Sequence, residues 1–359
     1  LMSISTYFAV IPDESFIIWE RTIKTMILSI IICSLINNRI RIHALIWMIV
    51  ISIGYYGAKG AVPTVLSGGM SSVAGPGGSM ISDNNTIALA MVMTLPLMNY
   101  LRMQSDKAWV RWALFSVLIL TTLSVFGSYS RGGFLALLGL SMVYWWRSSR
   151  KIVSMVVVVG IGSMFAAFMP QQYFDRLNTI ETASETDGSF IGRVEARQVG
   201  INIAAAKPLG VGFRGYETGR VFQKYSPAGG TERPRAMHSI YFEVLADHGY
   251  GGLVLFLLIG FFTWRNTRWI FKATLRLPKL KWANDLAHML ELSIIGYAIG
   301  GAALSMAYYD VYWAVVAVSV SLRLLIQKTI VGMDEDVANA NLDEGNIAGA
   351  TGINRKVRS

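Results

Sequence analysis

The sequence of 359 residues has little charge and almost no cysteine. Only 15% of its residues are charged, 53% are hydrophobic and the mean hydropathy is +0.46, which leaves a soluble domain too little polar surface to cover itself. The single cysteine, Cys33, excludes an internal disulfide framework and a thiolate metal site. We infer that a lipid bilayer is the solvent for most of the chain.

Several common catalytic signatures are also missing. The sequence has no glycine-rich phosphate loop with its lysine, no metalloprotease histidine pair and no nucleophile elbow. Two aspartates flanking one residue, the metal signature of sugar-nucleotide transferases, occur only as Asp334-Glu335-Asp336 in a polar C-terminal stretch, which reads as a solvated acidic run. The net charge is +10, but Lys and Arg are spread over many short links, so we expect no nucleic acid partner. The sequence therefore predicts a site without metal or cofactor.

Apolar stretches near twenty residues long recur along the chain instead. A helix of that length crosses roughly 30 Å of hydrocarbon and satisfies its own backbone hydrogen bonds there. We predict an all-α, polytopic membrane protein with about ten spans in this chain. The predicted spans are residues 1–11, 22–36, 44–62, 87–101, 112–129, 133–146, 152–169, 250–264, 287–307 and 311–326. Because the chain begins at Leu1 within an apolar run, we expect earlier helices and about twelve spans in the full protein.

The basic residues between the spans predict which loops share a side. The links at 39–41, 102–111, 147–151 and 265–281 are basic, and the positive-inside rule places them in the cytoplasm. The opposite side receives a Gly/Ser-rich loop and a long insertion with balanced charge. These extracytoplasmic segments are residues 68–86 and 170–237.

The chain divides into four regions on this basis. They are N-terminal spans at 1–169, a large loop at 170–249, C-terminal spans at 250–326 and a polar tail at 327–359 that we expect to be disordered in the cytoplasm. Helical spacing over 193–206, followed by Gly and Pro turns, predicts that the large loop is a folded cap. Residues 12–21 place acidic side chains on both sides of the apolar run 16–19. This pattern suits either a helix in the membrane interface or an extension of the next span.

The four histidines fall on two sides of the membrane. His43 and His288 sit at cytoplasmic ends of spans, whereas His238 and His248 lie on the outer side. His238 closes the long insertion, so a lipid headgroup could reach it. An imidazole, with a pKa of about 6.5, is well suited to take a proton from a sugar hydroxyl at neutral pH. The alternative is an interfacial histidine that only caps a helix.

Arginine gives the second functional signal. Arg131 interrupts two apolar helices, and an intramembrane guanidinium usually faces a cavity or an anion. Alternatively, it snorkels from a hairpin turn to the headgroups. The predicted cap adds six arginines: Arg193, Arg197, Arg214, Arg220, Arg233 and Arg235. Because guanidinium groups bind phosphate oxygens through paired hydrogen bonds, such a cluster predicts a phosphate or pyrophosphate ligand.

Four motifs together resemble the O-antigen ligase family. His238-Ser239, followed by Gly249 and Gly252, resembles the motif in the last large periplasmic loop of these ligases. Gly192-Arg193, followed fifteen residues later by Pro208-Leu209-Gly210-Val211-Gly212, resembles the start of the same loop across the O-antigen ligase and polymerase superfamily. Ser130-Arg131-Gly132-Gly133 resembles its membrane-edge arginine. The stretch 75–85 is similar to a subgroup of O-glycosylation ligases associated with exosortase systems.

The resemblance implies a membrane-embedded, metal-independent, inverting glycosyltransferase of the polyprenyl-donor (GT-C-like) class. It would act at the periplasmic face of a Gram-negative inner membrane and transfer a glycan from undecaprenyl pyrophosphate to lipid A core oligosaccharide, in lipopolysaccharide biosynthesis. The resemblance implies that His238 is the general base. Arg131 and Arg193 would bind the donor pyrophosphate, assisted by Arg197 or Arg214, although many members have tryptophan in place of Arg197. Ser239 and Glu243 would orient the base, unless Glu243 is a helix-surface residue.

Other functions fit the same pattern. The superfamily architecture also serves polymerases, which join lipid-linked repeats, and protein O-oligosaccharyltransferases, which glycosylate Ser or Thr. A transporter would need charged residues distributed through the spans, which carry few. An intramembrane protease would need Ser128 or Ser130 paired with His238. The sequence leaves the acceptor and the oligomeric state open.

Overall fold

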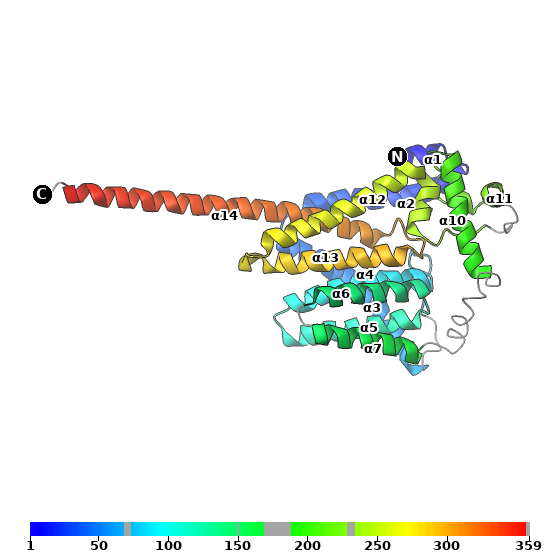
Figure 1. Ribbon diagram of the computed structural model, residues 1–359, viewed down its shortest axis with the longest axis horizontal. Helices are drawn as coiled ribbons and strands as arrows, with labels where there is room; N and C mark the ends of the chain where they lie inside the picture. The colour runs from blue at the N-terminus through cyan, green and yellow to red at the C-terminus, as the bar shows by residue number, and fades with distance from the viewer. Residues whose placement is uncertain (68–72, 149–150, 169–187, 228–233, 357–359) are drawn as a thin grey trace.

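The computed structural model describes residues 1–67, 73–148, 151–168, 188–227 and 234–356, and within these ranges the regular elements are helices. One group of helices lies side by side in a bundle, and a second group forms a cap at one end (Figure 1). The bundle helices are α2 (Pro12–Leu35), α3 (Arg39–Leu66), α4 (Asn84–Gln104), α5 (Ala108–Gly127), α6 (Arg131–Arg147), α7 (Lys151–Phe168), α12 (Ile240–Thr274), α13 (Lys281–Gly301) and α14 (Asp310–Lys356). The cap contains α1 (Met2–Tyr7), α10 (Gly188–Ala206), η1 (Gly215–Glu217) and α11 (Gly219–Tyr225), while η2 (Pro278–Leu280) joins α12 to α13.

The all-helical prediction is confirmed, but the number of spans is not. Five described helices are long and apolar enough to cross a membrane: α3, α4, α5, α12 and the 310–333 part of α14. The predicted fragment at 1–11 is only the six-residue α1. Residues 12–21 do not form a separate interface helix, because α2 runs without interruption from Pro12, whose ring is tolerated in the first helical turn. Residues 12–21 are therefore the first turns of the helix that continues into the predicted span at 22–36, although α2 is not one of the five helices above.

Helix α4 forms the centre of the bundle. It contacts α3, α5, α6 and α13, and every side chain from Ile87 to Met93 is buried. Asp83 starts this helix, since its carboxylate accepts hydrogen bonds from the backbone N–H groups of Asn85 and Thr86 at 2.8 and 3.1 Å. The loop before α4 is thereby fixed at the cap end of the bundle.

The basic links gather at the opposite end, as the charge pattern predicts. Arg39 at the start of α3 donates to Gln104 at the end of α4 at 3.2 Å, and Gln104 donates to Asp285 of α13 at 3.0 Å. The guanidinium of Arg39 also lies 5.2 Å from the ring centroid of Trp282. These contacts hold three links together, and we refer to this end as the link end.

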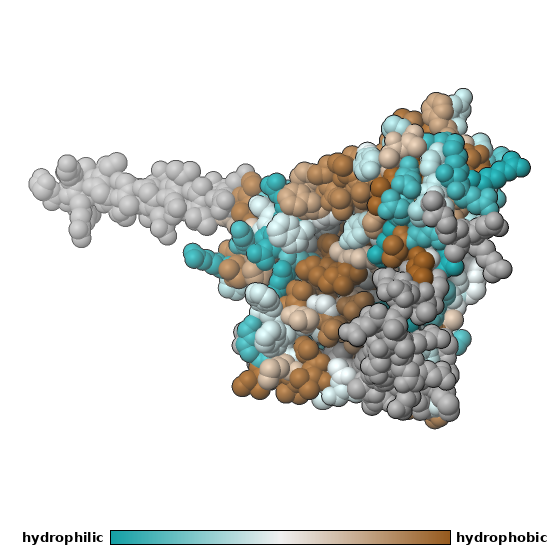
Figure 2. Space-filling view, turned by 45° about the vertical axis from the view of Figure 1, so that its right-hand side comes forward, coloured by the Kyte–Doolittle hydropathy of each residue, from teal (hydrophilic) through white to brown (hydrophobic). Residues whose placement is uncertain are grey.

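The surface matches this arrangement of a bundle and a cap. Figure 2 shows hydrophobic side chains over the bundle helices and hydrophilic ones over the cap. Large apolar side chains such as Ile152, Val254 and Leu255 are at least half exposed. Such exposure is costly in water, so the chain is a multi-pass membrane protein.

Helix α14 continues into the predicted polar tail. Its backbone is helical through Lys356, and it projects away from the bundle (Figure 1). Residues 327–356 contain no proline, and their four alanines favour a helix whereas their four glycines oppose it. The acidic run Asp334-Glu335-Asp336 lies on this projecting part.

An ion pair between a buried carboxylate and a partly exposed arginine joins α6 to α13, and a hydrogen bond from α12 adds a third helix. The carboxylate of Glu291 on α13, which is 2% exposed, accepts from both terminal nitrogens of Arg147 on α6, at 2.7 and 3.0 Å. The indole nitrogen of Trp264 on α12 donates to the same carboxylate at 2.8 Å. A bidentate pair of this kind satisfies a carboxylate that would otherwise be costly to bury.

We predict that Arg147→Met destabilises the protein by about 3 kcal/mol, because it leaves the Glu291 carboxylate buried without its cation. Denaturant unfolding of the detergent-solubilised protein measures this change. Arg265→Met, at an exposed position of α12, is the matched control. The double variant Arg147→Met with Glu291→Leu should recover much of the loss. Equal stability of the Arg147 and Arg265 variants would contradict the prediction.

Candidate active site

A cavity of about 600 Å³ lies where the cap meets the bundle. Five segments line it: α2, the loop before α4 with the start of α4, the chain before η1, the chain from Ala236 to Glu243, and the α13–α14 loop. Their lining residues are Ile18, Arg21, Thr22, Thr25, Gly78, Ser79, Met80, Ser82, Asp83, Asn85, Thr86, Arg214, Ala236, His238, Glu243, Leu304, Ser305, Met306, Ala307 and Tyr308. The cavity thus collects His238, Arg214 and Glu243 from the residues that the sequence predicts.

His238 has an unusual backbone and a perturbed imidazole. Its φ is +46°, in the left-handed region that non-glycine residues seldom adopt, and it stands two residues before α12 begins. The half-buried side chain lines the cavity. Burial, together with the positive charges of Arg193 and Arg197, lowers the pKa of His238 below its ordinary value. The imidazole is therefore neutral at pH 7 and can accept a proton.

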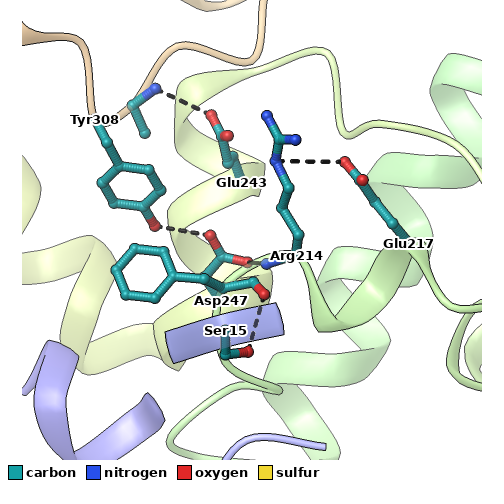
Figure 3. Close-up of polar contacts among 8 residues, drawn as sticks. Ser15, Arg214, Glu217, Glu243, Asp247 and Tyr308 are labelled. Atoms are coloured by element: carbon teal, nitrogen blue, oxygen red, sulfur yellow. Dashed lines mark hydrogen bonds and ion pairs between the residues drawn. The ribbon is translucent and has the colours of Figure 1, made fainter. Parts of the chain in front are cut away.

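Two buried carboxylates on α12 hold the walls of the cavity together (Figure 3). Glu243 accepts a hydrogen bond from the backbone N–H of Ala307 at 3.0 Å. One turn later, Asp247 accepts from the hydroxyl of Tyr308 at 2.8 Å and from the backbone N–H of Arg214 at 2.9 Å. The start of α12 therefore binds both the α13–α14 loop and the chain before η1.

The glycines of the sequence motifs allow this close packing. Gly210 and Gly249 have positive φ, and a Cβ atom on either would collide with backbone, of Asp247 and of Pro208 respectively. The N–H groups of Val211 and Gly212 donate to the carbonyls of Ala246 and Asp247 at 3.0 and 3.1 Å. The Pro208–Gly212 motif and the Gly249 position thus form one contact between two backbones.

Gly249 also explains why α12 begins ten residues before the predicted span at 250–264. With φ 69° and ψ −169°, it breaks the helix inside α12, so residues 240–248 form a short segment that precedes the predicted span at 250–264. Gly192 has a comparable role on α10, since a side chain there would collide with the guanidinium of Arg235. Gly192 therefore leaves room for a second arginine beside Arg193.

Arg131 and Arg193 meet in a smaller polar pocket of about 220 Å³. Its lining residues are Asn84, Asn85, Tyr129, Arg131, Gly132, Arg193, Ala303 and Leu304. Arg131 is exposed at the first position of α6 and lines this pocket. Asn85 and Leu304 line both this pocket and the larger cavity. The two spaces therefore share walls.

The structure separates the other predicted arginines. Arg197 donates to the carbonyl of Ala302 at 3.1 Å and packs over the ring of Phe242, so it supports the α13–α14 loop without lining either space. Arg214 lines the larger cavity and has a loose contact of 3.8 Å with Glu217. Arg220 is exposed on α11. Arg233 lies outside the described residues.

The remaining histidines have structural partners. His248 is buried, its Nδ1 lies 2.6 Å from the hydroxyl oxygen of Ser5, and the ring of Phe213 packs against it. His248 does not line the cavity, although the sequence places it on the same side as His238. At the link end, Nε2 of His43 lies 2.6 Å from the hydroxyl oxygen of Tyr100.

The sequence predicts that Ser239 and Glu243 orient His238, and only Glu243 of the two lines the cavity. Glu243 lines the cavity and is buried, so it is not a helix-surface residue. Ser239 is buried, and its hydroxyl finds no hydrogen-bond partner among the described residues. Sequence reasoning missed Asp247, four residues after Glu243, and the cavity residues Arg21, Asp83 and Tyr308. For Asp83 the signal was its place in the 75–85 motif.

No three His, Cys, Asp or Glu side chains come together as metal ligands within the described part of the chain. Positive charge around the cavity comes instead from arginine. The arrangement can bind oxyanions and can accept a proton at His238.

Comparison with known proteins adds two matches and one absence. Residues 113–257 match the family described as O-antigen ligase, and residues 1–106 match a family of unknown function. No curated protein matches the chain. The first match includes all seven site residues that the sequence predicts. Over residues 113–257, this multi-pass membrane protein is therefore similar to the O-antigen ligase family.

Proposed function

We propose that the protein is an O-antigen ligase that transfers a glycan from undecaprenyl pyrophosphate to a sugar hydroxyl of lipid A core oligosaccharide. One observation carries the proposal: the pocket of Arg131 and Arg193 shares walls with the cavity of His238. An oxyanion site beside a neutral imidazole suits a reaction that releases a pyrophosphate and consumes a hydroxyl proton. The family match supports the same reaction class.

The arginine pocket would bind the donor pyrophosphate. Guanidinium forks pair with phosphate oxygens and stabilise the charge that develops on the leaving group as the glycosidic C–O bond breaks. The 220 Å³ of this pocket suits a phosphate group rather than a glycan. The undecaprenyl tail would lie in the bilayer, against the apolar surface of the bundle.

His238 would activate the acceptor. Its imidazole takes the proton of the acceptor hydroxyl while the hydroxyl oxygen bonds to the anomeric carbon, and undecaprenyl pyrophosphate departs from the opposite face with the electron pair. Attack opposite to the leaving group inverts the anomeric configuration. The guanidinium groups supply the positive charge, so we expect the reaction to proceed without a metal ion.

The cap end would face the periplasm of a Gram-negative inner membrane. The basic links at the other end support this orientation, because such links stay in the cytoplasm. Polymerisation of lipid-linked repeats and transfer to protein use the same chemistry, and they are outcomes of the assay below.

We predict that His238→Gln abolishes transfer, since the amide cannot accept the hydroxyl proton at neutral pH. Purified protein receives undecaprenyl-pyrophosphate glycan and lipid A core in EDTA, and the glycosylated core is quantified. His43→Gln, at the link end, is the matched control and should retain full transfer.

Three outcomes would contradict parts of the proposal. Full transfer by His238→Gln would remove His238 from the mechanism. Lengthened carrier-linked chains in place of glycosylated core would indicate a polymerase. Activity that is lost in EDTA and restored by a divalent cation would contradict metal independence.

The lowered pKa of His238 predicts the pH dependence of transfer. A base must be unprotonated, so kcat/KM should be constant near neutral pH and fall in acid, with a midpoint below 6.5. Arg197→Gln removes one positive charge that lowers this pKa, so the midpoint should rise. A pH–rate profile of both proteins measures the shift. A midpoint above 6.5 in the unmodified protein would contradict the lowered pKa of His238.

Arg131→Lys should reduce transfer by about tenfold or more although it keeps the charge, because a point charge does not reproduce the guanidinium fork. The comparison is Arg220→Lys on the exposed face of α11, which should have no effect. Initial rates at saturating acceptor and varied donor measure the change. If both variants transfer at the normal rate, Arg131 contacts only headgroups.

A further inference from the structure

The structure divides the arginines near His238 into two groups, although the sequence assigns them to one ligand. Arg131 and Arg193 line the small pocket, whereas Arg214 lines the larger cavity together with Arg21 of α2, which no sequence motif contains. His238 lines only the larger cavity. The two groups therefore lie on different sides of the walls that Asn85 and Leu304 share.

Arg21 and Arg214 come from two segments, α2 and the chain before η1, that are joined by a hydrogen bond. The hydroxyl of Ser15 on α2 donates to the carbonyl of Phe213 at 3.0 Å, next to Arg214 (Figure 3). Arg21 follows Ser15 by six residues, or about 9 Å along the helix. Two long guanidinium side chains therefore reach the cavity from neighbouring positions.

The carboxylates of the cavity already have partners, whereas Arg21 retains its capacity to bind an anion. Asp83 accepts from the α4 N–H groups and from the hydroxyl of Thr86, and Glu243 accepts from Ala307. The described residues place no carboxylate within ion-pair distance of Arg21. The contact of Arg214 with Glu217 is long at 3.8 Å.

The geometry of an inverting reaction indicates which substrate the larger cavity would hold. The nucleophile must approach the anomeric carbon opposite to the leaving group, so donor pyrophosphate and acceptor occupy separate spaces that meet at that carbon. The acceptor hydroxyl must also reach His238. The volume of about 600 Å³ is within the usual range for small-molecule sites, whereas the arginine pocket is below it.

We propose, resting on the proposed transferase function, that the larger cavity is the acceptor subsite and that Arg21 and Arg214 bind an oxyanion of the acceptor. This oxyanion is a phosphate ester or a carboxylate on a sugar near the accepting hydroxyl. The two arginines thereby determine acceptor specificity, and the ligase distinguishes anionic from neutral core sugars. The donor pyrophosphate binds in the small pocket, at Arg131 and Arg193.

Steady-state kinetics with matched acceptors test the proposal. The acceptors are core oligosaccharide as isolated, the same material after removal of its phosphates, and the same material after reduction of its carboxylates. The enzyme is reconstituted in nanodiscs of phosphatidylcholine, which carries no net charge. The oxyanion whose removal raises the acceptor KM identifies the chemical class.

We expect Arg21→Gln and Arg214→Gln to raise the KM for the anionic acceptor by about tenfold or more, the scale of losing a charge-assisted hydrogen bond. The KM for the donor and for the acceptor that lacks the oxyanion should stay unchanged. Lys24→Gln is the matched control on α2, because Lys24 pairs with Glu20 at 2.6 Å and does not line the cavity. A raised donor KM with an unchanged acceptor KM would overturn the proposal.

Direct binding separates this proposal from the proposed function. Binding of the isolated core oligosaccharide to the nanodiscs is measured by microscale thermophoresis without donor, so it needs no turnover. Binding that weakens in Arg21→Gln and Arg21→Ala, in a protein without transferase activity, would keep the anion site and reject the ligase. Active ligase whose binding is equal for all three acceptors would reject the anion site alone. Loss of acceptor binding in the Lys24 control as well would show that charge on α2 acts non-specifically, and would also reject it.

Discussion

Two buried carboxylates at the start of α12 determine how the cap is fixed to the bundle. Glu243 and Asp247 lie one turn apart and accept hydrogen bonds from Ala307, Tyr308 and Arg214, which belong to two segments far apart in the sequence. A buried carboxylate without donors is costly, so the energy that keeps these groups satisfied also keeps the segments in register. Both walls of the larger cavity depend on this register.

The glycines of the sequence motifs allow the close backbone contact that the hydrogen bonds at Asp247 need. Hydrogen bonds from Arg214 and Gly212 to Asp247 can form only if the backbone at 208–212 approaches α12 without a side chain between them. The break at Gly249 then turns the chain from this contact into the span. The geometry around His238 thus depends on glycines, which have no functional side chain.

The arginines line two separate spaces, the small pocket and the larger cavity, and this separation matters for the proposed function. A single cluster would bind one polyanion, whereas two groups that flank a neutral imidazole can bind two anionic partners on opposite sides of a reacting carbon. The shared walls at Asn85 and Leu304 mark the place where those partners would meet. Burial and the positive charges of Arg193 and Arg197 also lower the pKa of His238, so Arg193, which lines the small pocket, also favours the neutral imidazole.

The sequence alone determined the helical class and the ends at which the basic links and the cap lie, and five of its candidate residues line the cavity or the small pocket, because hydropathy, charge and motif spacing are local properties. It could not show that α2 is continuous from Pro12 or that Gly249 breaks α12, since both depend on how neighbouring segments pack. Only the tertiary structure decided that His248 is buried against Ser5, that Arg197 supports a loop, and that Arg21 joins the site. A side chain becomes part of a site through contacts between distant segments, and linear spacing does not encode those contacts.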